Sequence, residues 1–384
     1  MQVKSFDYNV SHINTNEHYY TSSSIKKERG YFFSWLKTAK LTIYKCTHWE
    51  YYPFQLVYLP MYLVWLYYSI KARSLFFFAA SNPLIKNGGF LMESKKSIYD
   101  LMPTTVYPNT LFVKTENTVD GVLQKMNSVN LNFPVIAKPD VGMRGMAVKK
   151  INSIAELQHY ISTITVDYLI QEFIDLPQEA GIFYVRIPGE IKGKITGIVA
   201  KEFMTVTGDG KSSVLNLVER NPRYLLQLDA LSKIYGSRLS EIIPKGQTVN
   251  LIPYGNHCRG TKFIDATGWA SEKLNDAINN VCLQIPEFYY GRLDLKFNTI
   301  EELEEGKSFS IIELNAAGSE PTHIYDPTHS IFFAWKEIAE HFRLLYQVSA
   351  INKHNGASYL TFKEGMQMLK ENKELTKKLK AVAL

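Results

Sequence analysis

Cysteine is scarce in this sequence, which has only three in 384 residues: Cys46, Cys258 and Cys282. An odd number at wide spacings excludes a disulfide-stabilised scaffold, and no two of them have the paired spacing of a structural zinc site. The sequence therefore predicts a protein of a reducing compartment, and we expect the cytoplasm.

Long runs of one charge are also absent, because 43 basic and 37 acidic residues are spread along the chain and leave a net charge of +6. Without a basic block there is no footprint for nucleic acid, so no nucleic-acid partner is expected. The small positive excess favours anionic ligands or an anionic surface. Residues 1–30 lack the apolar stretch of a secretory signal and are rich in Ser, Thr, Asn and charge, which predicts a flexible arm.

What the chain does have is apolar residues, which make up 46% of it. That share and the length allow two or three compact units, each with a core. Beyond residue 90, short strands and helices alternate, and the turn PGEIKGK between two alternating apolar runs predicts a β-hairpin. Ser153 is the expected N-cap of one helix. The predicted strands are 110–114, 133–138, 145–149, 168–173, 181–187, 194–203, 289–297 and 309–314, and the predicted helices are 91–102, 119–129, 153–162, 214–220, 271–284, 330–346 and 362–383.

The segment 31–90 is unusually aromatic and predicted to be helical, and its part Tyr51 to Ile70 carries no charged residue. Three interpretations compete. A membrane-spanning helix needs about 20 apolar residues, which the length meets, although two prolines and many tyrosines disfavour it. An interfacial segment, in which 51–80 touches the inner face of a membrane, is favoured by Trp65 beside Lys71 and Arg73. The third interpretation is a helical hairpin packed on the rest of the protein, and the residues alone leave all three open.

The first group of residues that indicates chemistry is FPVIAKPDVGMRGMAV, residues 133–148. A strand delivers Lys138 and then breaks into a loop with Gly142 and Gly145. Glycines let backbone N–H groups approach an anion closely, and a lysine at a strand end supplies a positive charge for phosphate. The same pattern also fits an ordinary turn.

The second group is Gln171, Glu172, Phe173 and Ile174, with Glu179 farther along. An extended segment of this kind can offer backbone groups to the edge of an adenine, while a downstream carboxylate can accept hydrogen bonds from ribose hydroxyls. Two glutamates on a solvated surface would explain the same residues.

The third group lies on two strands that we expect to be adjacent and antiparallel, GRLDLKF and IIELNAAGSEP. Arg292, Asp294, Glu313 and Asn315 would project from one face, because residues two apart share a side of a strand. Two carboxylates and an amide oxygen form a hard oxygen site of the kind that Mg²⁺ prefers. The alternative is a structural ion-pair cluster of Arg292 with Asp294 and Glu313.

The order of these groups, Lys-Pro with a glycine loop, Gln-Glu-Phe-Ile, Arg-x-Asp and Glu-x-Asn, resembles the ATP-grasp superfamily, in particular the D-alanine:D-alanine ligases. The stretches TGDGKSSVLNLVERNPR and IPKGQTVNLIPYGNHCRGTKFIDAT are similar to the ATP-grasp region of cyanophycin synthetase and of fused glutathione synthetases. The resemblance covers about Leu91 to Tyr346. It implies an α+β ATP-grasp fold in which two subdomains clasp ATP. The implied organisation is a lid subdomain with its lead-in helix at 91–175, a catalytic subdomain at 176–348 and a C-terminal helical tail at 349–384.

The resemblance also implies a role for each motif residue, with ATP and Mg²⁺ as cofactors, two ions being expected and Mn²⁺ a substitute. Lys138 and one of Lys95 and Lys96 would hold phosphates, and Arg292 with Lys138 would be catalytic. The remaining implied positions are the phosphate loop at Gly142, Arg144 and Gly145, the adenine contacts at Glu172, Phe173 and Ile174, the ribose contact at Glu179, and the metal ligands Asp294, Glu313 and Asn315.

Two departures from the family pattern concern the substrate. The arm and the aromatic segment stand where the family has an open α/β domain, and GNHCRGTK replaces the Ser-Thr-Gly-Gly pattern of the relatives. The basic residues of that stretch would either bind a substrate carboxylate or phosphate, or lie on a loop without a ligand. The candidate substrate residues are Arg186, His257, Arg259, Lys262, Gly318 and Ser319.

The expected activity is that of a carboxylate–amine ligase, which forms an amide or peptide bond through an acyl phosphate and releases ADP and phosphate. Its expected partners are a small carboxylate and an amine, amino acid or peptide-like. One alternative is an ATP-grasp kinase that phosphorylates a small molecule, and another is a membrane-associated nucleotide-binding protein without turnover. The sequence indicates no particular oligomeric state.

Overall fold

The computed structural model describes residues 35–143, 145–251 and 261–382. The predicted arm at 1–30, Arg144, His257 and Arg259 lie outside these ranges. Within them the chain forms two compact units, and each is described by itself. The smaller contains the described residues up to Val57 and those of Glu202–Lys262, and the larger contains Tyr58–Lys201 with those of Phe263–Leu384.

The smaller unit consists of short helices and a two-stranded antiparallel sheet, which share one apolar core. Arg223 donates to the buried Glu50 carboxylate over 2.7 Å and to the Thr261 carbonyl oxygen over 3.2 Å, and this ties distant parts of the unit together. Its elements are α2 (Trp35–Thr47), η1 (Trp49–Tyr51), β7 (Thr205–Thr207), α8 (Val214–Glu219), α9 (Pro222–Leu225), α10 (Leu228–Tyr235), η4 (Gly236–Ser240) and β8 (Thr248–Asn250).

The larger unit contains two antiparallel sheets. The first has four strands in the order β1-β4-β2-β3, and its helices cover a core that includes Val135, Leu157 and Ile170. Ser153 caps α7 as predicted, since its side chain accepts from the Glu156 amide. The elements of this sheet and its helices are β1 (Thr110–Val113), α6 (Val119–Ser128), β2 (Val135–Pro139), β3 (Lys149–Ile151), α7 (Ile154–Thr163) and β4 (Tyr168–Glu172).

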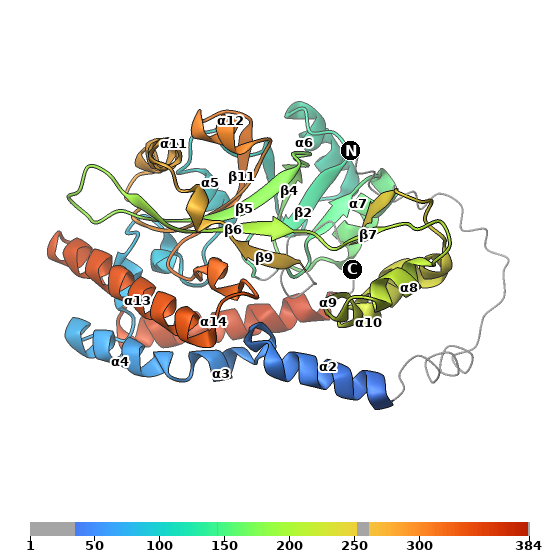
Figure 1. The fold of residues 1–384 in the computed structure, drawn as a ribbon. Coiled ribbons are helices and arrows are strands. Elements are labelled where there is room, and N and C mark those ends of the chain that lie inside the picture. Colours follow the sequence, from blue (N-terminus) through green and yellow to red (C-terminus); the bar gives the residue numbers. More distant parts are fainter. Residues whose placement is uncertain (1–34, 144, 252–260, 383–384) are drawn as a thin grey trace. The chain divides into compact units, whose positions relative to one another are not determined.

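The second sheet has five strands in the order β11-β10-β5-β6-β9. The predicted hairpin is confirmed as β5 paired with β6, and β10 lies between β5 and β11. Figure 1 shows α11 and α12 on one side of this sheet and α13 on the other, in agreement with the two separate cores that these helices share with it. Its strands are β5 (Gln178–Val185), β6 (Lys194–Glu202), β9 (Lys262–Asp265), β10 (Tyr290–Phe297) and β11 (Phe309–Asn315).

Further helices surround the second sheet, and one of them extends past its predicted end. Among these, α13 runs on to His354, eight residues beyond the predicted end at 346, because apolar residues such as Val348 continue its buried stripe. The remaining elements are η3 (Lys86–Gly89), α5 (Lys95–Tyr99), η6 (Thr267–Trp269), α11 (Glu272–Leu283), α12 (Ile300–Glu304), η7 (Thr322–Tyr325), α13 (Ile331–His354) and α14 (Phe362–Ala381).

Two predicted elements were wrong in extent. The helix expected at 91–102 is reduced to α5, because Ser94 caps its start at Lys95 and the regular helix ends at Tyr99. The strand expected at 145–149 begins only at Lys149, because Gly145 and Ala147 adopt left-handed backbone with φ of 68° and 55°. This turn extends the glycine loop at the expense of the strand.

The aromatic segment forms α3 (Phe54–Tyr58), α4 (Met61–Ala72) and η2 (Phe77–Ala80). One side of α4 packs on α13, and the Trp65 ring lies 4.9 Å from that of Phe77 and 5.0 Å from that of Phe342. Packing of this helix on the rest of the larger unit is therefore confirmed. In the described ranges, no helix combines the length and the apolar character that crossing a bilayer requires.

Candidate active site

The third group of predicted residues lies together on one face of the five-stranded sheet. Strands β10 and β11 pair so that Asp294 is opposite Glu313 and Arg292 is opposite Asn315. Directly opposed residues share a face in an antiparallel pair, and residues two apart along a strand do as well. All four side chains therefore project from the same side, as the sequence predicted.

Arg292 and Asp294 form an ion pair with two hydrogen bonds. Arg292 Nε donates to Asp294 Oδ1 over 2.8 Å, and Arg292 Nη2 donates to Asp294 Oδ2 over 3.1 Å. Burial alone would raise the pKa of Asp294, but Arg292 and Lys201 outweigh it and lower that pKa below its usual value. The pair of Arg292 with Asp294 is therefore present, as the alternative of a structural ion-pair cluster expects. Asn315 Nδ2 also donates to Asp294 Oδ2, over 3.5 Å. A cation is still not excluded, because a carboxylate has about four lone-pair sites and these three bonds leave one of them free.

Lys201 was missed by the sequence analysis, and it extends this charged cluster. Its ammonium lies 2.6 Å from Glu179 Oε1 and 3.9 Å from Asp294 Oδ2, and all three side chains are buried. Burial by itself would lower the pKa of Lys201, but Asp294 and Glu179 raise it above its ordinary value. Glu179, the predicted ribose contact, is therefore engaged by a lysine. No motif marks Lys201; its only signal is the alternation of β6.

Gly181 makes room for the pair formed by Arg292 and Asp294. A Cβ atom at Gly181 would lie 2.9 Å from Asp294 Oδ1 and 3.1 Å from the Arg292 Cδ atom. Real Cβ atoms almost never lie within 3.0 Å of another atom, and the distance to Asp294 Oδ1 is shorter than that. The side chains of β10 therefore lean across β5 at a position where only glycine fits.

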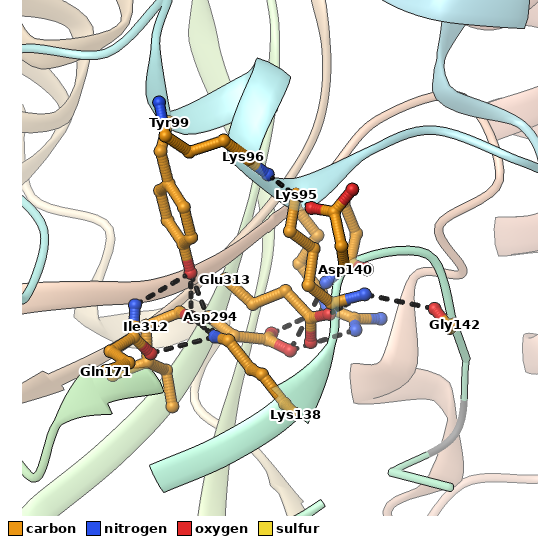
Figure 2. A network of polar contacts seen from close by, with 12 residues as sticks. Lys95, Lys96, Tyr99, Lys138, Asp140, Gly142, Gln171, Asp294, Ile312 and Glu313 are labelled. Carbon is orange, nitrogen blue, oxygen red and sulfur yellow. Dashed lines mark hydrogen bonds and ion pairs between the residues drawn. The ribbon is translucent and has the colours of Figure 1, made fainter. Parts of the chain in front are cut away.

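Lys138 lies at the end of β2, facing the backbone of β11. Its ammonium donates to the Tyr99 hydroxyl over 3.0 Å, to Gln171 Oε1 over 2.8 Å and to the Ile312 carbonyl oxygen over 3.0 Å. Figure 2 shows the Tyr99, Lys138 and Gln171 side chains pointing toward one another. Burial lowers the pKa of Lys138 to about 8, while the neighbouring Glu313 opposes that shift. Lys138 is thus held in place by neutral groups and keeps a proton that an anion would stabilise.

Of the two candidate lysines on α5, Lys95 is the one that reaches the cluster. Its ammonium lies 3.5 Å from Glu313 Oε1 and donates to the Gly142 carbonyl oxygen over 3.1 Å, as Figure 2 shows. The Lys96 side chain instead pairs with Asp100 on its own helix. Only the backbone amide of Lys96 contributes, by donating to the Asp140 carboxylate over 2.8 Å. Lys95 therefore links the sheet carboxylates to the glycine loop.

The glycine loop after β2 lies beside the C-terminal helix as well as beside Lys95. A Cβ atom at Gly142 would be 3.3 Å from Pro139 Cβ and 3.5 Å from Leu379 Cδ1, so the loop packs on the end of α14. Gly145 adopts φ of 68°, a conformation that suits glycine. The loop is thus held at both sides, by Lys95 and by Leu379.

The predicted adenine segment follows β4. The Glu172 carboxylate accepts from the Asn109 amide over 3.3 Å, so it binds backbone near β1. The Phe173 ring lies under two ammonium groups, that of Lys150 at 3.8 Å and that of Lys296 at 5.4 Å from its centroid. Burial lowers the pKa of Lys296. Ile174 is half-buried. The structure therefore joins this segment to both sheets of the larger unit.

The candidate substrate residues are not gathered at the cluster. Arg186 donates to the Phe288 carbonyl oxygen over 3.4 Å and lies beside Cys282, whose thiol belongs to the core on the opposite face of the sheet. Its expected place at the site is not supported, because it alternates with Val185, which shares the face of Arg292. Lys262 lies 3.7 Å from Glu202 at the sheet edge. His257 and Arg259 are outside the described residues.

Gly318 and Ser319 form a turn directly after β11. The Ser319 hydroxyl and amide both donate to the Ala316 carbonyl oxygen, over 2.6 and 3.0 Å. A Cβ atom at Gly318 would lie 2.3 Å from the Phe90 carbonyl oxygen, so this position needs glycine. The next residue, Glu320, accepts from Arg292 through its backbone carbonyl over 3.1 Å. The turn thus supports Arg292.

The donor set determines which metal would fit here. Across the described ranges, no three or more His, Cys, Asp or Glu side chains come together in a way that could hold an ion. The oxygen atoms of the Asp294 and Glu313 carboxylates and of the Asn315 amide are hard donors that suit Mg²⁺ when phosphate oxygens complete its shell.

Glu93 has a buried carboxylate oxygen, Oε2, which has no hydrogen-bond partner in the described part of the chain. Burial raises the pKa of Glu93, Lys95 lowers it and Glu313 raises it, and the net shift is upward.

Comparison with known proteins gives a family match for part of the chain. Residues 93–233 match the family described as the RimK-like ATP-grasp domain. The glutathione biosynthesis bifunctional protein GshAB of Streptococcus mutans serotype c is 26% identical over 218 residues, which cover 50% of this chain and 28% of that protein. The chain therefore matches less than a third of the length of this curated relative.

Solved structures of similar fold include two that each cover 68% of this chain. One is a bifunctional glutathione synthetase from Pasteurella multocida, with 15% identity, a TM-score of 0.37 and 38% of that chain covered. The other is a D-alanine–D-alanine ligase from Bacillus anthracis, with 12% identity, a TM-score of 0.39 and 69% of that chain covered.

Proposed function

From the premise that this protein carries a RimK-like ATP-grasp domain of the α+β class, we propose that it is an ATP-dependent carboxylate–amine ligase. It joins a small carboxylate to an amine through an acyl phosphate and releases ADP and phosphate. The observation that carries this proposal is the meeting of opposite charges at one place. Asp294, Glu313 and Asn315 project from one face of β10 and β11, and Lys138 and Lys95 lie beside them.

The proposed nucleotide site uses both sheets of the larger unit. Lys138 and Lys95 bind phosphate oxygens, and the loop through Gly142 covers them, since it is already tethered to Lys95. Phe173 and Ile174 flank the adenine, and Glu179 contacts the ribose. Glu179 is at present bonded to Lys201, so nucleotide binding has to share or replace that ion pair.

Asp294, Glu313 and Asn315 are the proposed ligands of Mg²⁺, or of Mn²⁺ in its place. When bound, the ions supply positive charge that offsets the charge on the transferred phosphoryl group. Glu313 is more accessible than Asp294, because 35% of its side chain is exposed against 9% for Asp294. Asp294 takes part while it remains bonded to Arg292, through the lone-pair site that Arg292 and Asn315 leave free.

The chemistry that these residues support occurs in two steps. A substrate carboxylate oxygen attacks the γ-phosphorus of ATP, the bond to the β-phosphate oxygen breaks, and ADP leaves an acyl phosphate behind. The amine then attacks the acyl carbon, gives up a proton, and expels inorganic phosphate. Arg292 stabilises the negative charge that develops in both steps, and the closed glycine loop keeps water from the acyl phosphate.

The substrates are proposed to be an amino acid or a short peptide and an amine of the same class. The name of the curated relative, a protein of glutathione biosynthesis, supports this class. We also propose a cytoplasmic location, which the two described cysteines support because both are free thiols. Among the candidate substrate residues, Gly318 and Ser319 remain in the proposal because their turn supports Arg292.

The test is ADP release by the full chain, measured against a panel of amino acids, short peptides, amines and hydroxy acids, with mass analysis of the products. The ligase proposal expects ADP release that needs both a carboxylate and an amine, together with a condensed product and free phosphate. A stable phosphorylated product without condensation would replace it with the kinase alternative. Nucleotide binding without turnover of any pair of substrates would contradict both the ligase proposal and the kinase alternative.

A further inference from the structure

Helix α4 is apolar on two opposite sides, and among the described residues only one of these sides is covered. Its inner side includes Met61, Trp65 and Ser69, which are buried or half-buried and belong to the contact with α13 and η2. Tyr68 on the same side stacks on Tyr346 of α13, with 5.1 Å between ring centroids. This side accounts for the packing of the helix, so the other side needs a separate explanation.

The outer side is a continuous apolar stripe that faces away from the described parts of the larger unit. Its members recur every three or four residues, which is the spacing of one helical face. Their exposed fractions run from 48% for Leu66 to 72% for Leu63. We name this the outer stripe, and it consists of Leu59 just before the helix and of Tyr62, Leu63, Leu66, Tyr67 and Ile70 on α4.

The outer stripe continues into a groove at the C-terminal end of α4. The groove has a volume of about 520 Å³, and its walls include Leu66 and Ile70 of the stripe together with Leu75 and Phe362. The exposed Arg73 and the hydroxyl group of Ser74 lie in the same lining. Apolar walls with a cation and a hydroxyl group suit a chain that is apolar along its length and anionic at one end.

Charge distinguishes a lipid surface from a protein as the occupant of this face. No acidic residue occurs between Glu50 and Glu93, while this stretch contains Lys71, Arg73 and Lys86. Lys71 lies at the end of the outer stripe, with its ammonium 5.4 Å from the Tyr67 ring centroid. Two copies of the chain that met through this face would bring like charges together. An anionic bilayer would pair Lys71 and Arg73, which lie at the stripe and in its groove, and exposed tyrosines beside cations are typical of the headgroup zone.

We propose that the outer stripe and its groove dock on an anionic lipid bilayer, with α4 lying in the plane of the headgroups. Twelve residues of helix span about 18 Å at about 1.5 Å per residue, which suits a helix that lies on a membrane. The leucines and Ile70 enter the boundary of the acyl chains, and Lys71 and Arg73 contact headgroup phosphates. The protein is held at the surface without a spanning segment.

The test is flotation of the full chain with vesicles of phosphatidylcholine alone and of phosphatidylcholine mixed with phosphatidylglycerol. The proposal expects binding to the mixed vesicles that weakens as salt rises. The double variant Leu63→Asp with Ile70→Asp is expected to weaken it about hundredfold, because two exposed apolar side chains lose their burial in lipid. The matched control is Ile191→Asp, which changes an isoleucine that is 87% exposed in the β5–β6 turn. It is expected to bind as the unmodified protein does.

A second variant separates charge from burial. Lys71→Gln with Arg73→Gln is expected to lower affinity for the mixed vesicles about tenfold and to leave any binding to phosphatidylcholine alone unchanged. Absence of binding to both kinds of vesicle overturns the proposal. Equal binding by the Leu63→Asp, Ile70→Asp variant overturns it too, since lipid would then be using another surface.

A second copy of the chain as the occupant would give a distinct result. A concentration-dependent dimer that the Leu63→Asp, Ile70→Asp variant abolishes, without vesicle binding, would make this face a contact between copies of the chain. Neither vesicle binding nor this dimer depends on ligase activity. Thermal unfolding of each variant beside the unmodified protein shows whether the fold is kept, and both changed residues are exposed enough for that to be expected.

Discussion

The two faces of strand β10 carry different kinds of side chain, charged on one and apolar on the other. On one face lie Arg292 and Asp294, with Glu313 of β11 opposite. On the other face, Leu293 and Leu295 are fully buried in the core that α11 covers. One face follows the ordinary alternation of a core strand. The other carries charges at the corresponding positions although burial of charge is costly, and the proposed function gives these charges a role.

Removing a carboxylate from the charged face gives the largest expected effects. Glu313→Ala is expected to lower ATP turnover about 10³-fold with little change in stability, because Glu313 is partly exposed. Asp294→Ala should lose turnover and also about 3–5 kcal/mol of unfolding free energy, since it leaves Arg292 buried without its carboxylate partner, while Lys201 keeps Glu179. Steady-state kinetics and chemical denaturation of both variants measure the two effects. Full turnover in a folded Glu313→Ala protein would contradict the assignment of this face.

A truncation on the apolar face should give the opposite result. Leu295→Ala removes a fully buried side chain and is expected to cost about 2–5 kcal/mol of unfolding free energy. Turnover per folded molecule should stay within about threefold, because the side chain points away from Asp294. Denaturation midpoints and active-site-normalised rates separate stability from activity. If turnover fell as far as in Glu313→Ala at unchanged stability, the two faces would not have separate roles.

The two neighbouring lysines of α5 test the comparison with a matched pair. Lys95→Ala is expected to raise the KM for ATP about ten- to hundredfold, because Lys95 contacts both Glu313 and the glycine loop. Lys96→Ala removes only the pair with Asp100 on the helix surface and should leave the KM nearly unchanged. Equal effects in both variants would show that the orientation of α5 differs when nucleotide is bound.

His341 tests whether polar groups near the charged face can be purely structural. It packs against Phe183, opposite Arg292, and burial lowers its pKa to about 4. The unfolded state then binds more protons between about pH 6.5 and 4, so stability falls as pH falls through that window. From pH 7 to 5 this amounts to about 2 kcal/mol. Thermal melts of the unmodified protein and of His341→Gln check it; an equally steep acid loss in the variant would assign the effect to other groups.

The elements that follow from local sequence were the ones that the sequence predicted well. The β5–β6 hairpin, the alternation of β10 and β11, and the cap of α7 each depend on residues close together in the chain. The bounds of α5 and the start of β3 were predicted wrongly, because the Ser94 cap decides where α5 starts and left-handed residues delay β3. Such details depend on single backbone angles.

The candidate site was predictable where alternation alone places the residues. Arg292, Asp294, Glu313 and Asn315 share a face because strand geometry requires it. The roles of Lys201 and Tyr99 were not predictable, since both reach the site through contacts between segments far apart in sequence. Arg186, a predicted substrate residue, lies on the opposite face, so charge without register is a weak guide.

The most direct test of the account is calorimetric titration of a non-hydrolysable ATP analogue into the full-length protein, with and without Mg²⁺, repeated with Glu313→Gln. The account predicts that the unmodified protein binds the analogue much more tightly with Mg²⁺, and that Glu313→Gln loses most of this gain while it keeps its fold. Equal binding with and without Mg²⁺, or an unchanged gain in Glu313→Gln, would contradict the claim that this face of the sheet holds the cation of the nucleotide.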